Sequence, residues 1–353
     1  MKISSGIRDY TVTISDKLPT TQIYIDEMTF VIIDRKVYDL YKENVFAGIP
    51  EERLALIDAL EDKKTIDTAL ELCEKLTEIP AKRNMTLISF GGGITQDVTG
   101  FVANILYRGI HWVFYPTTLL AACDSCIGGK TSLNYKHYKN LLGTFFPPEE
   151  IRICTPFFDT LSDKDYESGL GEVVKFNILF GEEGIRRIER DIDRLLARDK
   201  TTLVSYVEKS LEFKKRYIEE DEYDRGIRIH LNYAHTFGHA FETVSNYAIP
   251  HGTAVAMGSI TANRISEKRG WLPSETVRRM EKILCSIIHI KNYTDISLKD
   301  NNPAIISAIR KDKKQTDESI KAVLLNSDMK LEIVSDVTVD EIEEAVRYLN
   351  TLI

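Results

Sequence analysis

One carboxylate and three imidazoles between residues 172 and 251 have the chemistry of a metal site. Glu172 stands in a Glu-Val-Val-Lys segment, His235 and His239 are four residues apart, and His251 is followed by a glycine. A carboxylate and two imidazoles are common zinc ligands, and three protein ligands leave one coordination position open. An open position lets the ion bind a substrate oxygen. We therefore predict a catalytic metal bound by Glu172 and two of these histidines.

The histidine that does not bind the metal would serve the substrate. Because the pKa of a histidine side chain lies near neutrality, such a residue can bind a phosphate or carry a proton. Cationic side chains from the central part of the chain suit a small phosphorylated or carboxylated substrate. These residues are Arg108, Lys130, Lys139, Lys175, Lys214 and Arg228.

Helices are expected to position these groups. Residues four apart share a helix face, so His235 and His239 would point the same way, with Asn232 one turn earlier. Glu172 and Lys175, three apart, would also face together. Helical spacing of apolar residues continues through most of the second half. The expected helices cover about 163–180, 182–198, 201–220, 232–245, 254–269, 274–288 and 339–349, with two short strands at 320–325 and 330–334.

A glycine run in the first half has the layout of a diphosphate-binding loop. The expected strand at 86–90 runs into Gly91, Gly92 and Gly93, and a helix is expected over 96–106. Glycines remove side-chain bulk, and the start of a helix offers free N–H groups to an anion. The run is not the G-x-G-x-x-G fingerprint, so a tight structural turn is an equal reading of the glycines alone.

Other polar residues of the first half could bind the rest of a dinucleotide. Thr117 and Thr118 follow an expected strand at 111–115, at the edge where open α/β sheets bind ligands. Three further residues could bind ribose hydroxyls or another polar group, although a surface charge is the commoner role of a single acid. They are Asp34, Glu61 and Lys64.

The order of these elements predicts the fold class. Strands and helices alternate over the first 150 residues, which favours a mostly parallel sheet with helices on its faces. A chain of 353 residues is long for one core, so two domains are expected. We place an α/β nucleotide-binding domain at 1–157 and a mainly α-helical metal- and substrate-binding domain at 158–353. Further strands are expected at 23–25 and 29–34, with a helix at 65–78.

The acidic composition argues against general binding to nucleic acids or membrane surfaces. The chain has 54 acidic and 46 basic residues and a net charge of −8, whereas such binders need a basic face. No apolar run is long enough for a membrane span, and the N-terminus does not read as a signal peptide. Five scattered cysteines fit reduced thiols, so we expect a cytoplasmic protein. Cys123 and Cys126 are expected to be small buried thiols in a loop.

Several longer segments together resemble the 3-dehydroquinate synthase family. The resemblance is continuous over about 90–180, resumes over 214–258, and is loose in the first and last 60 residues. It implies an NAD-dependent sugar-phosphate cyclase with the two-domain fold expected above. It also implies the conversion of 3-deoxy-D-arabino-heptulosonate 7-phosphate to 3-dehydroquinate, a step of the shikimate pathway that releases phosphate. The matching segments, in the order of the family, are 91–97, 108–109, 116–120, 124–131, 139–140, 169–175 and 232–239.

The resemblance also implies a role for individual residues. Glu172, His235 and His251 would hold zinc or cobalt, and Arg108 would reach the phosphate pocket of a partner subunit in a homodimer. The implied NAD contacts are Asp34, Glu61, Lys64, Gly91, Gly92, Gly93, Asp97, Thr117, Thr118, Lys130, Lys139, Phe157 and Thr160. The implied substrate contacts are Asp124, Lys130, Asn140, Lys175, Lys214, Arg228, Asn232 and His239, with Lys313 or Lys314 as a further phosphate ligand.

Departures from the family pattern leave the substrate open. Gln96 stands where the family has glycine, and Thr253 stands where it has glutamate. Sibling cyclases that make 2-deoxy-scyllo-inosose or 2-epi-5-epi-valiolone are therefore alternatives, as are a metal-dependent alcohol dehydrogenase of the glycerol dehydrogenase type and a non-catalytic nucleotide-binding protein. The joint presence of Lys130, Arg228 and His239 favours a substrate with both phosphate and carboxylate, and hence dehydroquinate synthesis.

Overall fold

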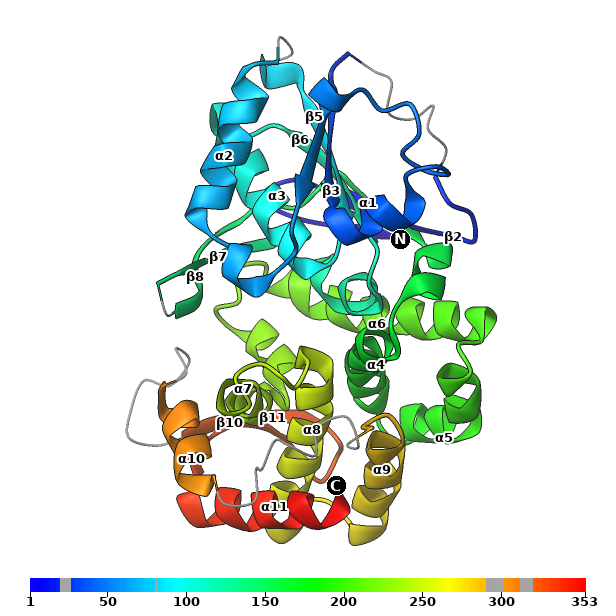
Figure 1. The fold of residues 1–353 in the computed structure, drawn as a ribbon. Helices are drawn as coiled ribbons and strands as arrows, with labels where there is room; N and C mark the ends of the chain where they lie inside the picture. Colours follow the sequence, from blue (N-terminus) through cyan, green and yellow to red (C-terminus); the bar gives the residue numbers. More distant parts are fainter. Residues whose placement is uncertain (20–26, 80–81, 137, 290–300, 312–319) are drawn as a thin grey trace. The chain divides into compact units, whose positions relative to one another are not determined.

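The computed structural model describes residues 1–19, 27–79, 82–136, 138–289, 301–311 and 320–353 (Figure 1). These residues form two compact units, Met1–Ser162 and Asp163–Ile353. The strand expected at 23–25 lies outside the described residues, and so do Lys313 and Lys314. Among the described residues, no helix is long and apolar enough to span a bilayer.

A seven-stranded sheet forms the centre of the first unit. Its strands follow the order β1-β2-β9-β6-β5-β3-β4; β1 pairs antiparallel with β2, and every other neighbouring pair is parallel. The adjacent strands β6, β5 and β3 are almost continuously buried, as expected for a parallel sheet that is covered on both faces. The strands are β1 (Lys2–Ile3), β2 (Tyr10–Ser15), β3 (Thr29–Asp34), β4 (Leu54–Ile57), β5 (Thr86–Gly91), β6 (His111–Pro116) and β9 (Glu150–Cys154).

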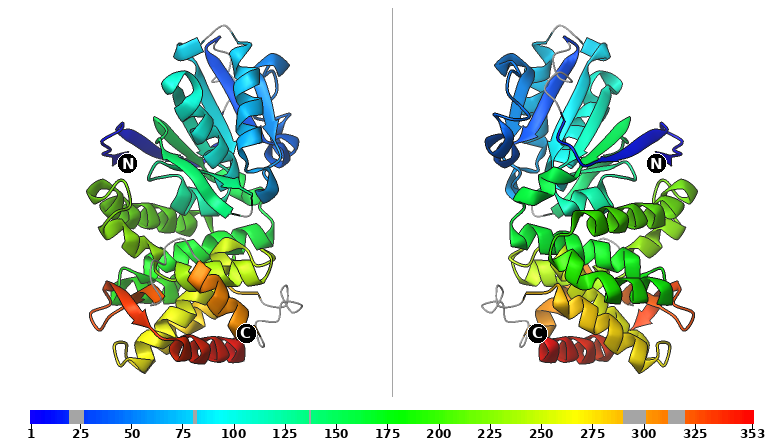
Figure 2. Two further views of the ribbon diagram at one scale, coloured as in Figure 1. Left: turned by 90° about the vertical axis from the view of Figure 1, so that its left-hand side faces the viewer. Right: turned by 90° about the vertical axis from the view of Figure 1, so that its right-hand side faces the viewer.

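Helices α1 (Arg35–Tyr41), α2 (Ile66–Thr77) and α3 (Gly93–Ile105) belong to the same unit. Helices α2 and α3 pack side by side, and α3 lies against β5 and β6 (Figures 1 and 2). Helix α3 begins at Gly93, three residues before the expected start, because Gly92 is already its N-cap. The glycine run therefore connects β5 to α3 without an intervening loop.

An antiparallel hairpin of β7 (Lys130–Tyr135) and β8 (Tyr138–Phe145) packs on α3. Neither of these strands was predicted from the sequence. In β7 the side chains of Thr131 and Leu133 are buried, whereas their neighbours are more exposed. This alternation is the period of a half-buried strand, and the many polar residues concealed it.

The second unit is mainly helical, as predicted. Helix α8 is its centre, with buried residues along almost its whole length, and both α4 and α7 pack on it. The antiparallel strands β10 (Ile320–Leu325) and β11 (Leu331–Val337) confirm the two strands expected near the end of the chain. The helices are α4 (Asp163–Ile178), α5 (Glu182–Leu196), α6 (Lys200–Glu220), α7 (His235–Val244), α8 (His251–Lys268), α9 (Ser274–Ser286), α10 (Asn302–Lys311) and α11 (Val339–Leu352).

Candidate functional site

Two glycines let α4 and α8 of the second unit touch backbone to backbone. A Cβ atom built on Gly171 would lie 2.0 Å from the carbonyl oxygen of Gly252, and one built on Gly252 would lie 1.7 Å from that of Ser168. Glu172 follows the first glycine, and His251 precedes the second. The crossing of the two helices therefore brings this carboxylate and this imidazole together.

A similar contact brings α7 against α8. A Cβ atom on Gly258 would lie 2.3 Å from the carbonyl oxygen of Ala234. Ala234 adopts a left-handed conformation with φ of 71°, and α7 begins with the next residue, His235. The close approach at Gly258 thus sets the position of the first residue of α7 relative to α8.

The three predicted metal ligands converge in the second unit. Oε1 of Glu172 lies 3.4 Å from Nε2 of His235 and 3.4 Å from Nε2 of His251. A tetrahedral zinc ion with bonds of about 2.0–2.2 Å holds its ligand atoms about 3.4 Å apart. The spacing of these atoms therefore fits a single ion between them.

Hydrogen bonds orient both imidazoles toward that position. Nδ1 of His235 donates to the carbonyl oxygen of Tyr233 over 3.0 Å, and Nδ1 of His251 donates to Oε2 of Glu242 over 3.0 Å. In the neutral form of each ring the proton is held at Nδ1, so Nε2 has its lone pair available for a metal. Neither Tyr233 nor Glu242 was predicted from the sequence, although the spacing of Glu242 from His235, seven residues, puts both on one face of α7.

Lys175 leaves only one oxygen of Glu172 for an ion. Its Nζ lies 2.6 Å from Oε2 of Glu172, which confirms that the two side chains face together. Glu172 is fully buried, and apart from this ion pair and the two imidazole nitrogens 3.4 Å from Oε1, neither of its oxygens has a hydrogen-bond partner among the described residues. A buried carboxylate oxygen without a partner is costly, and a cation at Oε1 would satisfy it. The residues present therefore fit a divalent metal.

The charges around this position also suit a cation. Burial alone would raise the pKa of Glu172, but Lys175 and the two histidines hold that pKa well below its usual value. Burial and the nearby Lys175 lower the pKa of His235 to about 3, so this ring is neutral. Burial would lower the pKa of His251, but Glu242 and Glu172 raise it to about 10. A metal would take the place of the proton on His251, as metal ligation requires.

His239 lies beside the three ligands but outside their group. Its ring centroid is 5.3 Å from that of His235 and 5.9 Å from that of His251. Asn232 was expected on the same helix, and this expectation is wrong. It ends a separate 3₁₀ helix, Ile227–Asn232, because the left-handed turn at Ala234 interrupts the chain before α7.

Two predicted cations of the second unit are buried. Lys214 of α6 is 7% exposed, and Arg228 of the 3₁₀ helix is 3% exposed. The guanidinium of Arg228 donates to the carbonyl oxygen of Glu222 over 2.5 Å. This 3₁₀ helix packs on α6, so the two cations come from adjoining elements. Charged side chains are seldom buried unless they have partners, and both residues make polar contacts with other parts of the protein.

In the first unit, the glycine run lies against Thr118. A Cβ atom on Gly92 would lie 3.0 Å from Cγ2 of Thr118, and one on Gly91 would lie 2.5 Å from the side chain of Thr95. The N–H of Thr117 donates to the carbonyl oxygen of Gly91 over 2.9 Å. Both predicted threonines are therefore brought to the glycine run.

Four polar side chains form a connected cluster in the same unit. Nζ of Lys64 donates to Oδ1 of Asn140 over 2.7 Å and forms an ion pair with Asp97. Oγ of Ser132 lies 2.8 Å from Oδ2 of Asp97 and 2.8 Å from Oδ1 of Asn140. The structure thus brings together three residues that the sequence had nominated separately, and it adds Ser132.

A second pair of contacts extends this cluster. Nζ of Lys139 lies 3.3 Å from Oε1 of Glu61, and Nδ2 of Asn134 donates to the same oxygen over 2.8 Å. Asn134 and Ser132 were missed, because strand β7 was not recognised. Residues two apart in a strand share a face. Recognition of β7 would therefore have placed Ser132 and Asn134 on one face as candidate site residues.

Other predicted residues of the first unit have clear structural contacts. Oδ1 of Asp34 caps α1 by accepting the N–H of Lys36 over 3.0 Å. Phe157 is buried with its ring edge on Tyr41 at a centroid distance of 4.9 Å, and the hydroxyl of Tyr41 lies 3.0 Å from that of Thr160. These contacts hold the three side chains in place.

Arg108, Asp124 and Lys130 lie in three different settings. Arg108 stands at φ of 66° in a turn whose neighbours, Tyr107 and Gly109, have φ of 51° and 110°. Asp124 belongs to a π-helical turn, Ala121–Ser125, and Lys130 is an exposed residue at the start of β7. Cys123 and Cys126 flank this aspartate as buried thiols outside any disulfide, in a helical turn rather than the expected loop.

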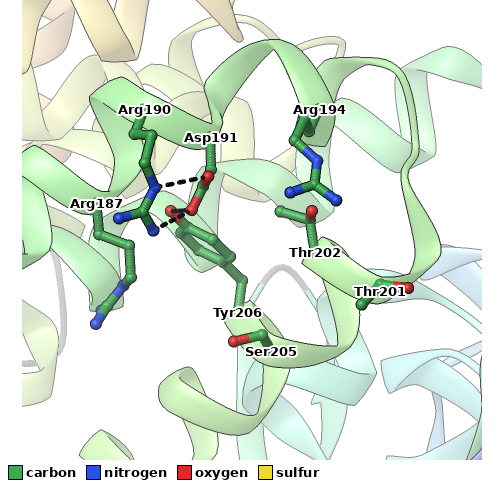
Figure 3. Close-up of a pocket in the computed structure, with 8 residues that line it drawn as sticks. All are labelled: Arg187, Arg190, Asp191, Arg194, Thr201, Thr202, Ser205 and Tyr206. Atoms are coloured by element: carbon green, nitrogen blue, oxygen red, sulfur yellow. Dashed lines mark hydrogen bonds and ion pairs between the residues drawn. The ribbon is translucent and has the colours of Figure 1, made fainter.

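A separate hollow of about 260 Å³ lies between α5 and α6 (Figure 3). Its arginines already have acidic partners: Arg190 lies 2.8 Å from Asp191, and Arg194 lies 3.0 Å from Asp199. None of the residues that the sequence nominated lines this hollow, and we assign it no role.

Comparison with known protein families gives matches along most of the chain. The model of the 3-dehydroquinate synthase N-terminal domain matches 54–168, and that of the C-terminal domain matches 169–315. The chain is 38% identical to 3-dehydroquinate synthase of Clostridium tetani over 319 residues, which are 90% of this chain and 84% of the relative. It is 34% identical to the enzyme of Dictyoglomus turgidum over 310 residues, 88% and 85% of the two chains.

Solved structures with the same fold confirm the predicted architecture. The 2-epi-5-epi-valiolone synthase ValA of Streptomyces hygroscopicus, with NAD⁺ and Zn²⁺ bound, has a TM-score of 0.85 at 23% identity over 97% of each chain. A 2-deoxy-scyllo-inosose synthase complexed with carbaglucose-6-phosphate, NAD⁺ and Co²⁺ has a TM-score of 0.84 at 24% identity over 99% of each chain. A probable glycerol dehydrogenase of Sinorhizobium meliloti is less similar, with a TM-score of 0.61 at 15% identity over 100% of this chain and 99% of the other.

Proposed function

Because this chain belongs to the 3-dehydroquinate synthase family, we propose that it is a 3-dehydroquinate synthase. It would convert 3-deoxy-D-arabino-heptulosonate 7-phosphate to 3-dehydroquinate and release phosphate, in the shikimate route to aromatic amino acids. The observation that carries the proposal is the convergence of Glu172, His235 and His251 in a chain with relatives of that name at 34% and 38% identity.

Glu172, His235 and His251 would hold a zinc or cobalt ion. When bound, the ion would polarise neighbouring hydroxyls of the sugar and make the loss of a proton easier. Lys175 keeps one oxygen of Glu172 engaged, so the carboxylate would bind through its other oxygen alone. With only three protein ligands, the site keeps a coordination position for the substrate.

Cations and polar groups of the second unit would hold an anionic substrate. Lys214 and Arg228 are buried, so their hydrogen bonds to a phosphate or carboxylate would be strengthened by the low local dielectric. His239, beside the metal ligands, would donate to the phosphate or carry a proton. Asn232 would hydrogen-bond the substrate as well. These side chains work mainly by fixing the substrate in one orientation through all steps.

The first unit would bind NAD, which supplies a hydride acceptor that returns the hydride before the product leaves. The backbone of the glycine run would approach the diphosphate, and the start of α3 would offer it N–H groups. Asp124 and Asn140 would contact the substrate. The proposed NAD contacts are Asp34, Glu61, Lys64, Gly91, Gly92, Gly93, Asp97, Thr117, Thr118, Lys130, Lys139, Phe157 and Thr160.

We also propose a homodimer in which Arg108 reaches the phosphate pocket of the partner. The turn that carries it has three consecutive residues with positive φ, two of which are not glycine. Such conformations cost about 1–3 kcal/mol each and concentrate at functional sites. This strain is the observation that supports a specific role for Arg108.

A sibling cyclase is the second candidate. The two sibling structures match the fold with TM-scores of 0.85 and 0.84, and Gln96 and Thr253 depart from the family pattern. The glycerol dehydrogenase type is disfavoured by its lower TM-score of 0.61.

A panel of three substrates separates these functions. Purified protein with NAD⁺ and zinc would receive the seven-carbon acid sugar phosphate, sedoheptulose 7-phosphate or glucose 6-phosphate, and phosphate release and absorbance of NADH would be followed. Phosphate release from the acid sugar alone, without net NADH, is the expected result. Release from either of the other two would point to a sibling cyclase. Net formation of NADH from an alcohol would point to a dehydrogenase.

A further inference from the structure

Glu242 of α7 lies behind one of the three proposed metal ligands. Its Oε2 is 3.0 Å from Nδ1 of His251, while Nε2 of the same ring lies 3.4 Å from Oε1 of Glu172. The imidazole of His251 is thus held between two carboxylates, one on each nitrogen. The side chain of Glu242 is 14% exposed, so little water competes for this hydrogen bond.

The other histidine ligand is oriented differently. Nδ1 of His235 donates to the main-chain carbonyl of Tyr233, whose own side chain is fully buried and donates to Oδ1 of Asn263 over 2.6 Å. The orientation of His235 is therefore determined by the backbone. The orientation of His251 depends on one side chain, and a carboxylate acceptor also makes an imidazole a stronger metal ligand than a carbonyl does.

We propose that Glu242 is a positioning residue that orients His251 and sets the affinity of the site for its divalent ion. This inference rests on the metal site of the proposed function. The residue does not touch the ion or the substrate. Removal of such a partner typically weakens metal binding 10- to 100-fold.

The same carboxylate could alternatively be a ligand itself. Nitrogen or oxygen atoms of His239, Glu242 and His251 lie within 4.8 Å of one another, as do those of Glu172, His235 and His251. The 3.0 Å separation between Glu242 and His251 is that of a hydrogen bond, which favours the positioning role. The two possible ion sites can be distinguished through His235, because it is a ligand in the site with Glu172 and not in the site with Glu242.

Zinc affinity of the protein without NAD or substrate provides the test. Metal-free protein would be titrated with zinc against a chromophoric chelator, and its cobalt complex would be recorded by visible absorption. We expect E242Q and E242A to bind one zinc with 10- to 100-fold weaker affinity and to show altered cobalt bands. The control E281Q makes the same chemical change in α9, where Glu281 accepts from Tyr348 over 3.0 Å, and it should bind zinc as the native protein does.

Each outcome bears on a different claim. Native protein that binds no zinc would overturn the proposed metal site itself. Native affinity in both Glu242 variants, with zinc bound by the native protein, would overturn only the role of Glu242. H235A should abolish binding; if it keeps one zinc that E242A loses, Glu242 is a ligand rather than a positioning residue. Metal-free Glu242 variants should keep the native circular dichroism spectrum, and their unfolding would contradict the proposal by giving Glu242 a role in the fold.

Discussion

Nζ of Lys175 lies 2.6 Å from Oε2 of Glu172, and both side chains are almost completely shielded from solvent, with 1% and 0% exposed. The two residues are one helical turn apart on α4, so the pair forms within a single element. In the absence of a metal, this ammonium is the main group that offsets the buried negative charge of Glu172.

Replacement of Lys175 should therefore show that a bound metal can also offset the buried negative charge of Glu172. K175M leaves a buried carboxylate without its cation, and we expect a loss of about 3–5 kcal/mol in the free energy of unfolding of the metal-free protein. Zinc should restore part of this loss, because it neutralises the same carboxylate. Urea unfolding with and without zinc measures both quantities. A K175M variant that is as stable as native protein in chelator would contradict the role of this pair.

The backbone contact between α4 and α8 gives a second prediction. In G252A, the new methyl group would lie 1.7 Å from the carbonyl oxygen of Ser168, so the two helices must separate. Overpacking typically costs about 1–3 kcal/mol, and a clash with backbone should exceed that range. Glu172 and His251 should also move apart, and zinc affinity should fall.

Thermal unfolding and zinc titration of G252A check these effects. S266A is a matched control on α8, because its buried hydroxyl has no hydrogen-bond partner among the described residues and its loss should be nearly neutral. Native stability in G252A would mean that α4 and α8 do not pack as closely as the structure describes.

Removal of the metal should abolish activity reversibly. We expect a chelator to stop phosphate release and added zinc or cobalt to restore it. A metal present at a hundredfold excess over its dissociation constant should also stabilise the native protein by about 2.7 kcal/mol. H251A should lose both the activity and the stabilisation. Activity that is indifferent to chelator would remove the metal from the mechanism.

Ser132 should affect binding of NAD through Asp97. Burial raises the pKa of Asp97, while Lys64 and Ser132 act in the opposite direction. S132A removes one of these favourable contacts, so the pKa of Asp97 should rise further. If Asp97 binds the cofactor as a carboxylate, affinity for NAD⁺ should fall about tenfold, the equivalent of one hydrogen bond to a charged group. The loss of affinity toward acidic pH should also begin at a higher pH in S132A than in native protein.

Titration calorimetry with NAD⁺ at several pH values measures this effect. T77A is a suitable control, because Thr77 lies in the same unit and its exposed hydroxyl donates to the carbonyl oxygen of Glu74. Equal affinity and equal pH dependence in S132A and native protein would exclude Asp97 and its neighbours from the NAD site.

The sequence predicted the elements whose patterns are strong. Strands β3, β5 and β6 are mostly apolar and almost continuously buried, and the long helices have clear apolar spacing. The three metal ligands were nominated by side-chain chemistry and by the resemblance to a known family. The convergence of these ligands depends on the close contacts that glycines allow between helices. No local sequence pattern predicts such contacts.

Other features were missed for physical reasons. The hairpin of β7 and β8 is rich in polar residues, so Ser132 and Asn134 were not placed on one face. Ala234 is a residue type that strongly favours helices, yet it adopts a left-handed conformation and separates Asn232 from α7. Tertiary packing of Gly258 against its carbonyl overrides that local preference.

The contact between Gly171 and Gly252 has a consequence for attempts to alter the chemistry of this protein. Neither position can accept even a methyl group, so directed evolution toward bulkier substrates cannot proceed by substitution there. Helix α7 contributes His235, His239 and Glu242 from one face, so substitutions of these three residues would change the metal site itself while the glycine contacts hold the helices in place.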